Sequence, residues 1–325
     1  MTEIEHADVT DATPLLWEVL SQCLREFGPI VRSGPGTFPT DAKAAAERTA
    51  YANWDVLRVS YERGCQALVA GEAHLRAALL LAEAEPVHVL TLFSAVRSAM
   101  EQLGLARWIL DRGLDPTTRA ARAWGVRWRD LDQGDLFAKD VGSDAFAEQI
   151  RGGMLALATE ADGFGLGIST KGDEQRITGI GIRQPGWTEL FGDVFDFRSG
   201  YRLYSAVAHG TQWALVRVGG QLREGWDALS PELLIEEVPA ADAVELSLRH
   251  ALHAYVITTT DALTLFTNDP EQLMRKIQDW AGEVGLPIEW LSDPIDNLRA
   301  DDTAEERTHP AGTSAVASGD VGSKE

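Results

Sequence analysis

Cysteines are few in this sequence, long apolar runs are missing, and each scarcity excludes a class of protein. The 325 residues include two cysteines, Cys23 and Cys65, which are too few for a disulfide framework and lack the spacing of a zinc site. No run approaches the roughly 20 apolar residues that span a bilayer. The amino-terminal residues are acidic, where a secretory signal is basic. We therefore expect a cytoplasmic protein in a reducing compartment, with no membrane partner.

Positive charge is also scarce. The chain has 29 Lys and Arg against 50 Asp and Glu, a formal net charge of -21, so it repels polyanions unless its basic residues are gathered in one place. One segment concentrates them, between residues 117 and 131, where tryptophans at helical spacing predict a core stripe. The arginines are expected on the other side, facing solvent or RNA phosphates. They are Arg119, Arg122, Arg127 and Arg129.

Hydrophobic residues recur at helical spacing through most of the chain, and they make up 45% of it, which is enough for a full core. Caps, glycines and prolines divide this pattern into helices with short connections. A short hairpin is predicted around residues 171–173, and a turn or hairpin at 221–230. The fold class is therefore all-α, a multi-helix bundle with a small irregular or β insertion. The predicted helices are residues 14–27, 40–52, 54–84, 87–111, 117–131, 143–161, 187–191, 195–216, 240–266 and 270–282.

The same caps, glycines and prolines divide the chain into five segments. An amino-terminal helical segment comes first, and the bundle follows in two parts that are separated by an insertion or flap. The tail has few apolar side chains to bury, so we expect it to be disordered. The segments are residues 1–53, 54–133, 134–186 (the insertion), 187–296 and 297–325.

One predicted late helix places Arg202, Ser205 and His209 on a single face. A separation of seven residues is nearly two helical turns, so His209 returns to within about 20° of Arg202 and lies about 10.5 Å further along the axis. Ser205 lies between them and Gln212 beyond. A guanidinium offers a fixed fork of donors and an imidazole titrates near neutral pH, so this face suits phosphate binding and proton transfer. The alternative is a polar seam whose groups are paired inside the protein.

Arg97 and Glu101 are charged residues in a predicted helix that is otherwise apolar nearly all round. Unpaired charges inside a protein cost several kcal/mol, so a network with Arg202 and His209 is expected. This network has two interpretations, which the sequence leaves open. It lines a groove that binds an anion, or it is an internal structural contact.

The segment R-L-Y-S-A-V-A-H, from Arg202 to His209, resembles the R-x6-H motif of the HEPN superfamily, all-helical domains that include metal-independent RNases. The resemblance implies that the motif lies on a late helix and that two copies meet across a dimer. It implies that Arg202 stabilises charge on the scissile phosphate and that His209 is the general acid and base. A second segment, A-V-R-S-A-M-E, ends at Glu101, and with the later S-A-V-A-H-G it is similar to uncharacterised bacterial helical proteins of HEPN-like type.

Two functions follow from these residues. The first is a non-catalytic HEPN-like module that binds a ligand or anion, or mediates an interaction. The second is a metal-independent RNase or nucleotide-processing enzyme that uses Arg202 and His209. Leu203 favours the first, because catalytic members of the superfamily usually have a polar residue directly after the arginine, and so does the acidic charge.

The candidate partners are a second copy of the chain and an RNA or nucleotide ligand. No cofactor is expected. A metal site is not expected either, because His250 and His253, three residues apart on a predicted helix, need more ligands than the sequence offers nearby.

Overall fold

A computed structural model describes residues 54–84, 88–171, 176–195, 198–211, 214 and 241–266, together with isolated positions between 18 and 47 and between 271 and 279. Gln212, the turn predicted at residues 221–230 and the tail predicted at 297–325 lie outside the described residues. Most of the helices predicted at 14–27, 40–52 and 270–282 also lie outside them.

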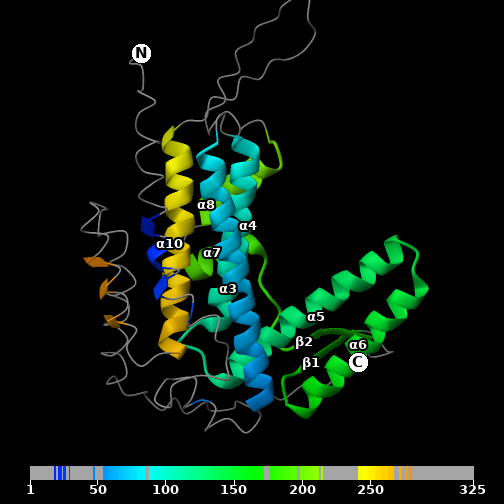
Figure 1. The fold of residues 1–325 in the computed structure, drawn as a ribbon. Helices are drawn as coiled ribbons and strands as arrows, with labels where there is room; N and C mark the ends of the chain where they lie inside the picture. The colour runs from blue at the N-terminus through cyan, green and yellow to red at the C-terminus, as the bar shows by residue number, and fades with distance from the viewer. Residues whose placement is uncertain are drawn as a thin grey trace, which may run out of the picture.

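The described residues are mostly helical, which confirms an all-α bundle with a small β insertion (Figure 1). Two short strands, β1 (Ile168–Lys171) and β2 (Arg176–Ile180), form the predicted hairpin and pair in antiparallel fashion. None of the described helices is long and apolar enough to cross a membrane. The helices are α3 (Trp54–Ala82), α4 (Val89–Leu110), α5 (Pro116–Asp140), α6 (Asp144–Gly163), α7 (Trp187–Phe195), α8 (Arg198–Ala208) and α10 (Ala241–Phe266).

Three long helices, α3, α4 and α10, run side by side and form the bundle, and α7 and α8 pack against α4 (Figure 1). Their facing sides are apolar and buried, with Leu75, Phe93 and Leu103 wholly enclosed. Gly71 allows the close approach of α3 to α4, because a Cβ atom there would lie 2.8 Å from the Leu103 side chain. Burial of this apolar surface is the main stabilising contribution to the fold.

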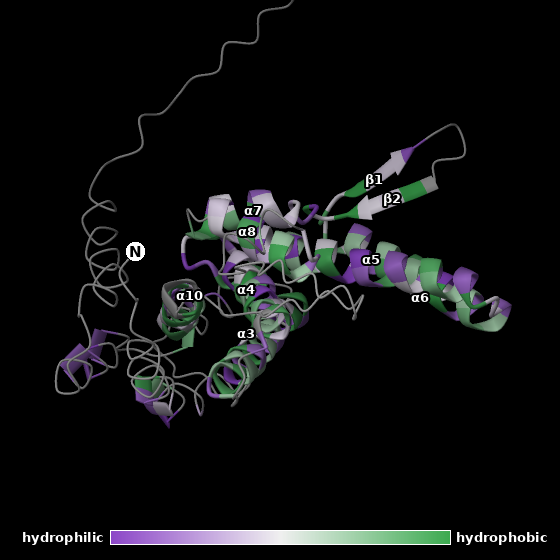
Figure 2. Ribbon diagram, turned by 90° about the horizontal axis from the view of Figure 1, so that it is seen from above, coloured by the Kyte–Doolittle hydropathy of each residue, from purple (hydrophilic) through white to green (hydrophobic). Residues whose placement is uncertain are grey.

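The helices α5 and α6 form an arm that extends from the bundle together with the hairpin (Figures 1 and 2). Asp115 caps α5, since its carboxylate accepts the Thr118 backbone N–H at 2.9 Å. Ser143 caps α6 by accepting the N–H of Phe146 at 3.4 Å.

The helix α5 is longer than predicted. It continues through Gly134 to Asp140, although glycine disfavours a helix by about 1 kcal/mol. Packing against α6 offsets that cost, because the missing side chain leaves room for Ile150, whose Cδ1 would lie 3.3 Å from a Cβ at Gly134. The predicted segment boundary between residues 133 and 134 therefore lies inside one helix, and the division of the chain into segments stays a prediction.

The single helix predicted at residues 195–216 is wrong in its extent. The structure has α7 ending at Phe195 and a separate helix, α8, ending at Ala208. The end is set by Gly210, which has the left-handed φ of +65° and donates its N–H to Val207 O at 2.8 Å. The N–H of Thr211 donates to Ala206 O at 3.0 Å, which completes a glycine-based helix C-cap. His209 is therefore the residue that caps α8, and does not lie within a longer helix.

Candidate functional site

Four side chains form a chain of contacts between α4 and α8, from the first turn of α8 to the residue that follows it. We call them the α4–α8 cluster: Tyr201, Glu101, Arg97 and His209. Arg97 donates from Nε to Glu101 Oε1 at 2.9 Å and from Nη1 to His209 Nε2 at 3.0 Å. Tyr201 donates its hydroxyl to the same Glu101 oxygen at 2.8 Å. One carboxylate thus orients the arginine that contacts the histidine.

The cluster forms because α8 buries one side against α4. Tyr201, Tyr204 and Val207 recur at helical spacing and are buried. The Tyr201 ring stacks on Phe191 of α7 with ring centroids 4.4 Å apart, and the Tyr204 ring packs near Phe93 of α4 at 5.8 Å. The packing of the apolar side of α8 therefore determines where Tyr201 and the capping His209 contact α4.

The charge states of the cluster follow from these contacts. Burial lowers the pKa of Arg97, but the hydrogen bond and charge of Glu101 outweigh it and leave the pKa raised. Burial, reinforced by Glu101, raises the pKa of Tyr201 to about 12, so its hydroxyl stays protonated and donates at neutral pH. The side chains of Arg97 and Glu101 are 23% and 19% exposed. The pair is therefore at the edge of the core, where solvent or a ligand can reach it.

The imidazole of His209 is exposed, and its contact with Arg97 determines its tautomer. A guanidinium has donors only, so His209 Nε2 must act as the acceptor and the ring proton lies on Nδ1. In this state the Nε2 lone pair is occupied, and His209 presents an N–H donor. The hydrogen bond from Arg97 therefore requires the Nδ1-protonated tautomer of His209.

Arg202 does not join the predicted four-residue network. Its side chain is exposed, and among the described residues no hydrogen bond or ion pair links it to Arg97, Glu101 or His209. Arg202 lies about 100° around α8 from the buried Tyr201, on the exposed side of the helix. His209 is also exposed, but it follows the last residue of α8, where Arg97 reaches it. Tyr201 takes the place expected for Arg202. The predicted network of Arg97, Glu101, Arg202 and His209 is therefore wrong in one residue, Arg202.

Arg202 and His209 nevertheless remain on one side of α8. The helix is regular through Ala208, and the N–H of His209 still donates to Ser205 O at 3.1 Å. The spacing expected from the sequence therefore holds, with the half-buried Ser205 between the two exposed side chains. Gln212, the fourth residue predicted for this face, lies outside the described residues.

The basic segment of α5 is used differently from the expectation. Arg119 is wholly buried, which is a correction, because it was expected on the outer side. It donates to Ile109 O at 2.9 Å and Asp111 O at 3.1 Å, carbonyls at the end of α4, and it pairs with Glu47 at 3.4 Å. Helix ends leave carbonyls without intrahelical donors, and Arg119 satisfies two of them.

The other three arginines of α5 lie over tryptophan rings. Arg122 is over Trp108 at 5.0 Å, and it also donates to the Trp108 carbonyl at 2.7 Å. Its half-burial lowers its pKa. Arg127 lies over Trp124 at 4.7 Å and Arg129 over Trp187 at 5.6 Å. Cation–π contacts of this kind stabilise the fold, so the segment is not a continuous basic strip for RNA.

The two histidines of α10 show no metal site in the described structure. His250 Nδ1 is 2.8 Å from the Tyr204 hydroxyl, and burial lowers the pKa of His250 to about 4, with the nearby His253 adding to the effect. Across the described ranges, no group of three His, Cys, Asp or Glu side chains is placed to hold a metal ion. His250 is accordingly a neutral hydrogen-bonding residue of the bundle at neutral pH.

Comparisons with known proteins found no match for this chain among family models, curated proteins or solved structures. The HEPN-like resemblance thus stays a prediction that rests on the two sequence segments that contain Arg97 and Arg202.

Proposed function

We propose that the protein is a non-catalytic, HEPN-like module that binds an anionic group at the α4–α8 cluster and the adjoining side of α8. The observation that carries the proposal is the hydrogen bond from Arg97 to His209 Nε2. It occupies the lone pair that a general base needs, while it leaves the imidazole N–H as a donor. Arg97, His209 and the exposed Arg202 then offer three donors to one ligand.

The surroundings of Arg97 support a binding role. Its Nε is held by Glu101, which in turn accepts from Tyr201, so the guanidinium is oriented before any ligand arrives. A donor held in place loses less conformational entropy on binding than a free surface arginine does. Arginine also presents a planar fork that matches phosphate and carboxylate oxygens. The cluster is thus a preorganised cation, and Arg202 adds a second cation on the exposed side of α8.

The experiment measures binding of a fluorescent ten-nucleotide RNA and of inorganic pyrophosphate to the full chain. We expect Arg97→Gln and Arg202→Gln each to weaken RNA binding about tenfold, the loss of one charge-assisted hydrogen bond. The salt dependence should fall too, by about 0.7 in the slope of log K against log salt for each RNA phosphate that is no longer neutralised. Circular dichroism checks that the variants stay folded.

Arg198→Gln is the matched control, because Arg198 is an exposed arginine of the same helix that lies one turn further from His209 than Arg202 does, and it is 4.0 Å from Asp193. It should change the affinity less than twofold. Equal loss of affinity in Arg198→Gln and Arg202→Gln would show non-specific attraction to positive charge. No binding of either probe by the wild type would contradict the proposal outright.

A metal-independent RNase is the second candidate, and one observation favours it. Arg202 and His209 are both exposed on the same side of α8, where a phosphate can reach both. Catalysis would require the Arg97 hydrogen bond to break so that His209 Nε2 becomes free to accept a proton. A homodimer would bring two such motifs together, as in the superfamily that the motif resembles.

Cleavage of a labelled RNA in excess EDTA separates the two candidates. The wild type, Arg202→Ala and His209→Ala should all cleave at background rates if the module is non-catalytic. Cleavage by the wild type that both substitutions abolish, with RNA binding retained by His209→Ala, would establish the RNase instead. Light scattering on the same samples reports whether an active form is dimeric.

A further inference from the structure

A groove of about 560 Å³ lies between α5 and the β1–β2 hairpin, away from the α4–α8 cluster. We call it the α5–hairpin groove. Its volume is in the range of small-molecule sites in proteins. Side chains from α5 form one wall, and residues of the hairpin and of the segment after β2 form the other. Those that carry the argument are Trp128, Arg129, Asp132, Arg183 and Gln184.

The two walls are fixed by backbone contact. Gly125 of α5 lies so close to the segment after β2 that a Cβ there would be 2.0 Å from Ile182 O. A Cβ on Gly181 would lie 2.1 Å from Ala121 O, and Gly181 has the left-handed φ of +62°. The N–H of Ile182 donates to Ala121 O at 2.9 Å. The groove is therefore formed in advance, as ligand sites commonly are.

Buried donors without a partner occur at several places in the described structure, such as Trp124 Nε1, but among the residues that line the groove only Gln184 has one. It is only 7% exposed, and its Nε2 amide has no hydrogen-bond acceptor among the described residues. A buried donor without a partner costs about 1–3 kcal/mol, so native proteins rarely retain one without a reason. Because Gln184 lines the groove, an acceptor oxygen on a bound molecule would satisfy it.

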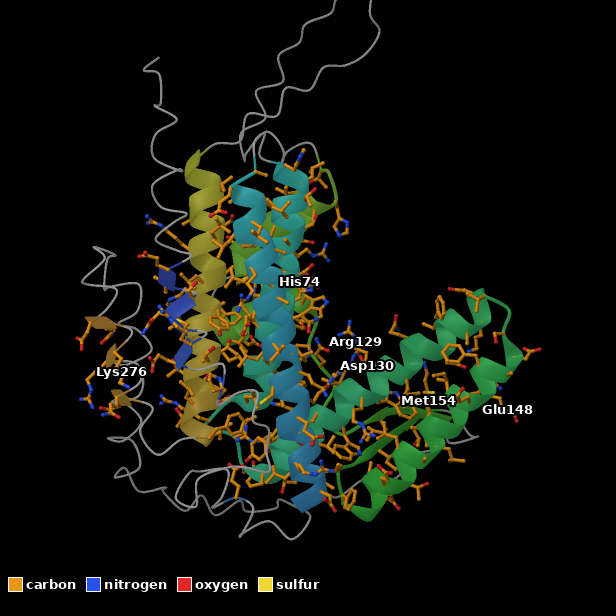
Figure 3. All side chains as sticks on the ribbon, in the orientation of Figure 1. His74, Arg129, Asp130, Glu148, Met154 and Lys276 are labelled. Carbon is orange, nitrogen blue, oxygen red and sulfur yellow. The ribbon has the colours of Figure 1, made fainter. Side chains whose placement is uncertain are left out.

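The charges of the groove identify the kind of acceptor. Arg129 on α5 and Arg183 after β2 contribute two cations from opposite walls, against one carboxylate, Asp132. This local excess of positive charge contrasts with the net charge of -21 of the whole chain. Figure 3 shows Arg129 on α5 near the point where the arm meets the bundle. Arginine side chains favour phosphate and carboxylate oxygens.

We propose that the α5–hairpin groove binds a small organic anion, an aromatic ring that bears a phosphate or carboxylate. Its anionic oxygens contact Arg129 and Arg183, one acceptor oxygen pairs with Gln184 Nε2, and its ring packs on Trp128, which lines the groove. The site shares no residue with the α4–α8 cluster, so it does not depend on the proposed function.

The test uses naphthyl phosphate, naphthoate and the uncharged naphthol as probes, with ligand-observed NMR and calorimetry on the full chain. Naphthol should bind at least tenfold more weakly than the preferred anion, and the other two probes show whether phosphate or carboxylate is preferred. Arg183→Gln should weaken binding of the preferred anion about tenfold, which corresponds to one charge-assisted hydrogen bond. Arg127→Gln, on the same helix as Arg129 but outside the groove, is the control and should retain the affinity.

Gln184→Leu provides the sharpest result, because the two readouts move in opposite directions. Replacing the unpaired amide by an apolar side chain of similar shape should raise Tm, while it weakens anion binding several-fold. A glutamine that only supports the fold would lower Tm when replaced, and that result would overturn the proposal. So would equal affinity for naphthol and the two anions, or no binding of any probe at 5 mM, roughly the weakest affinity of interest. Arg97→Gln should leave binding here unchanged, which separates this site from the α4–α8 cluster.

Discussion

The bundle, with the end of α5 that packs against it, differs from the α5–hairpin groove of the arm in how its buried polar residues are paired. At the start of α5, where that helix meets the bundle, Arg119 is enclosed and its two Nη atoms have several partners, although its Nε has none among the described residues. Asp261 on α10 is enclosed between Arg107 and Arg112. In the arm, the enclosed Gln184 lines a groove with an amide that has no acceptor among the described residues. A polar group whose partners lie within the protein stabilises the fold, whereas a buried donor that lines a groove without a partner is available to a ligand.

Removing Arg119 should produce the largest effect on the bundle. Arg119→Leu leaves Glu47 buried without its cation and takes the donor away from two carbonyls at the end of α4. We expect the free energy of unfolding to fall by about 3–5 kcal/mol, the cost of breaking a buried pair from one side. Guanidinium denaturation followed by circular dichroism measures it.

Arg127→Leu is the matched substitution on the same helix. The Arg127 side chain is 38% exposed and 4.0 Å from Glu160, so its loss should cost less than about 1 kcal/mol. If both variants lose the same free energy, the buried network of Arg119 does not stabilise the contact between α5 and the bundle.

The ionisation of Asp261 should give an effect of intermediate size on the free energy of unfolding, and this effect should depend on pH. Burial raises the pKa of this carboxyl to about 6, although Arg107 at 3.0 Å and Arg112 at 3.9 Å pull it down. The folded state therefore holds the Asp261 proton more tightly than the unfolded chain, whose carboxyl has a pKa of about 3.9. The contribution of the protonated Asp261 to the free energy of unfolding is therefore at its maximum below about pH 4, and it is lost as the pH rises through about 6.

Asp261→Asn has no such proton to lose. Between about pH 4 and pH 7 the free energy of unfolding of the wild type should fall relative to the variant by about 3 kcal/mol at most, roughly two pK units. Denaturation of both proteins at each pH unit gives the difference directly. A constant difference across that range would show that Asp261 is ionised throughout.

Two glycine substitutions should give the smallest effects, of opposite sign in the two regions. Gly71→Ala in α3 places a methyl group 2.8 Å from Leu103, and we expect it to lower the free energy of unfolding by about 1–3 kcal/mol. Gly152→Ala in α6 meets nothing within 4 Å, so the better helix propensity of alanine should raise stability by about 0.5–1 kcal/mol. Thermal unfolding compares them, and destabilisation by both would mean that the arm is packed as tightly as the bundle.

Local signals explain what the sequence could predict. The caps Asp115 and Ser143 and the helix α10 follow from residues next to each other in the chain. The hairpin follows from the turn signal at residues 171–173, although the glycines around it argue against a well-packed sheet. The pairing of Arg97 with His209 was also expected, because a charged residue in an apolar helix needs partners.

Tertiary contacts explain the features that the sequence could not predict. Arg119 is expected to be exposed until the end of α4 is placed beside it, and Gly134 is expected to end a helix until Ile150 packs over it. Tyr201 replaces Arg202 in the cluster because only the burial of α8 reveals which side faces α4. The α5–hairpin groove depends on two segments that are far apart in the chain, so no local pattern indicates it.

The contact between Glu47 and Arg119 has a practical consequence for any shortened form of the protein. Glu47 is buried, accepts a hydrogen bond from Tyr61 and pairs with Arg119, although it precedes the first long helix of the bundle. A recombinant fragment that starts at Trp54, where the hydrophobic pattern alone suggests a boundary, would leave the guanidinium of Arg119 enclosed without its carboxylate. A fragment that keeps the full stability must therefore begin upstream of Glu47, and a protease cut between residues 47 and 54 should allow the bundle to unfold more readily.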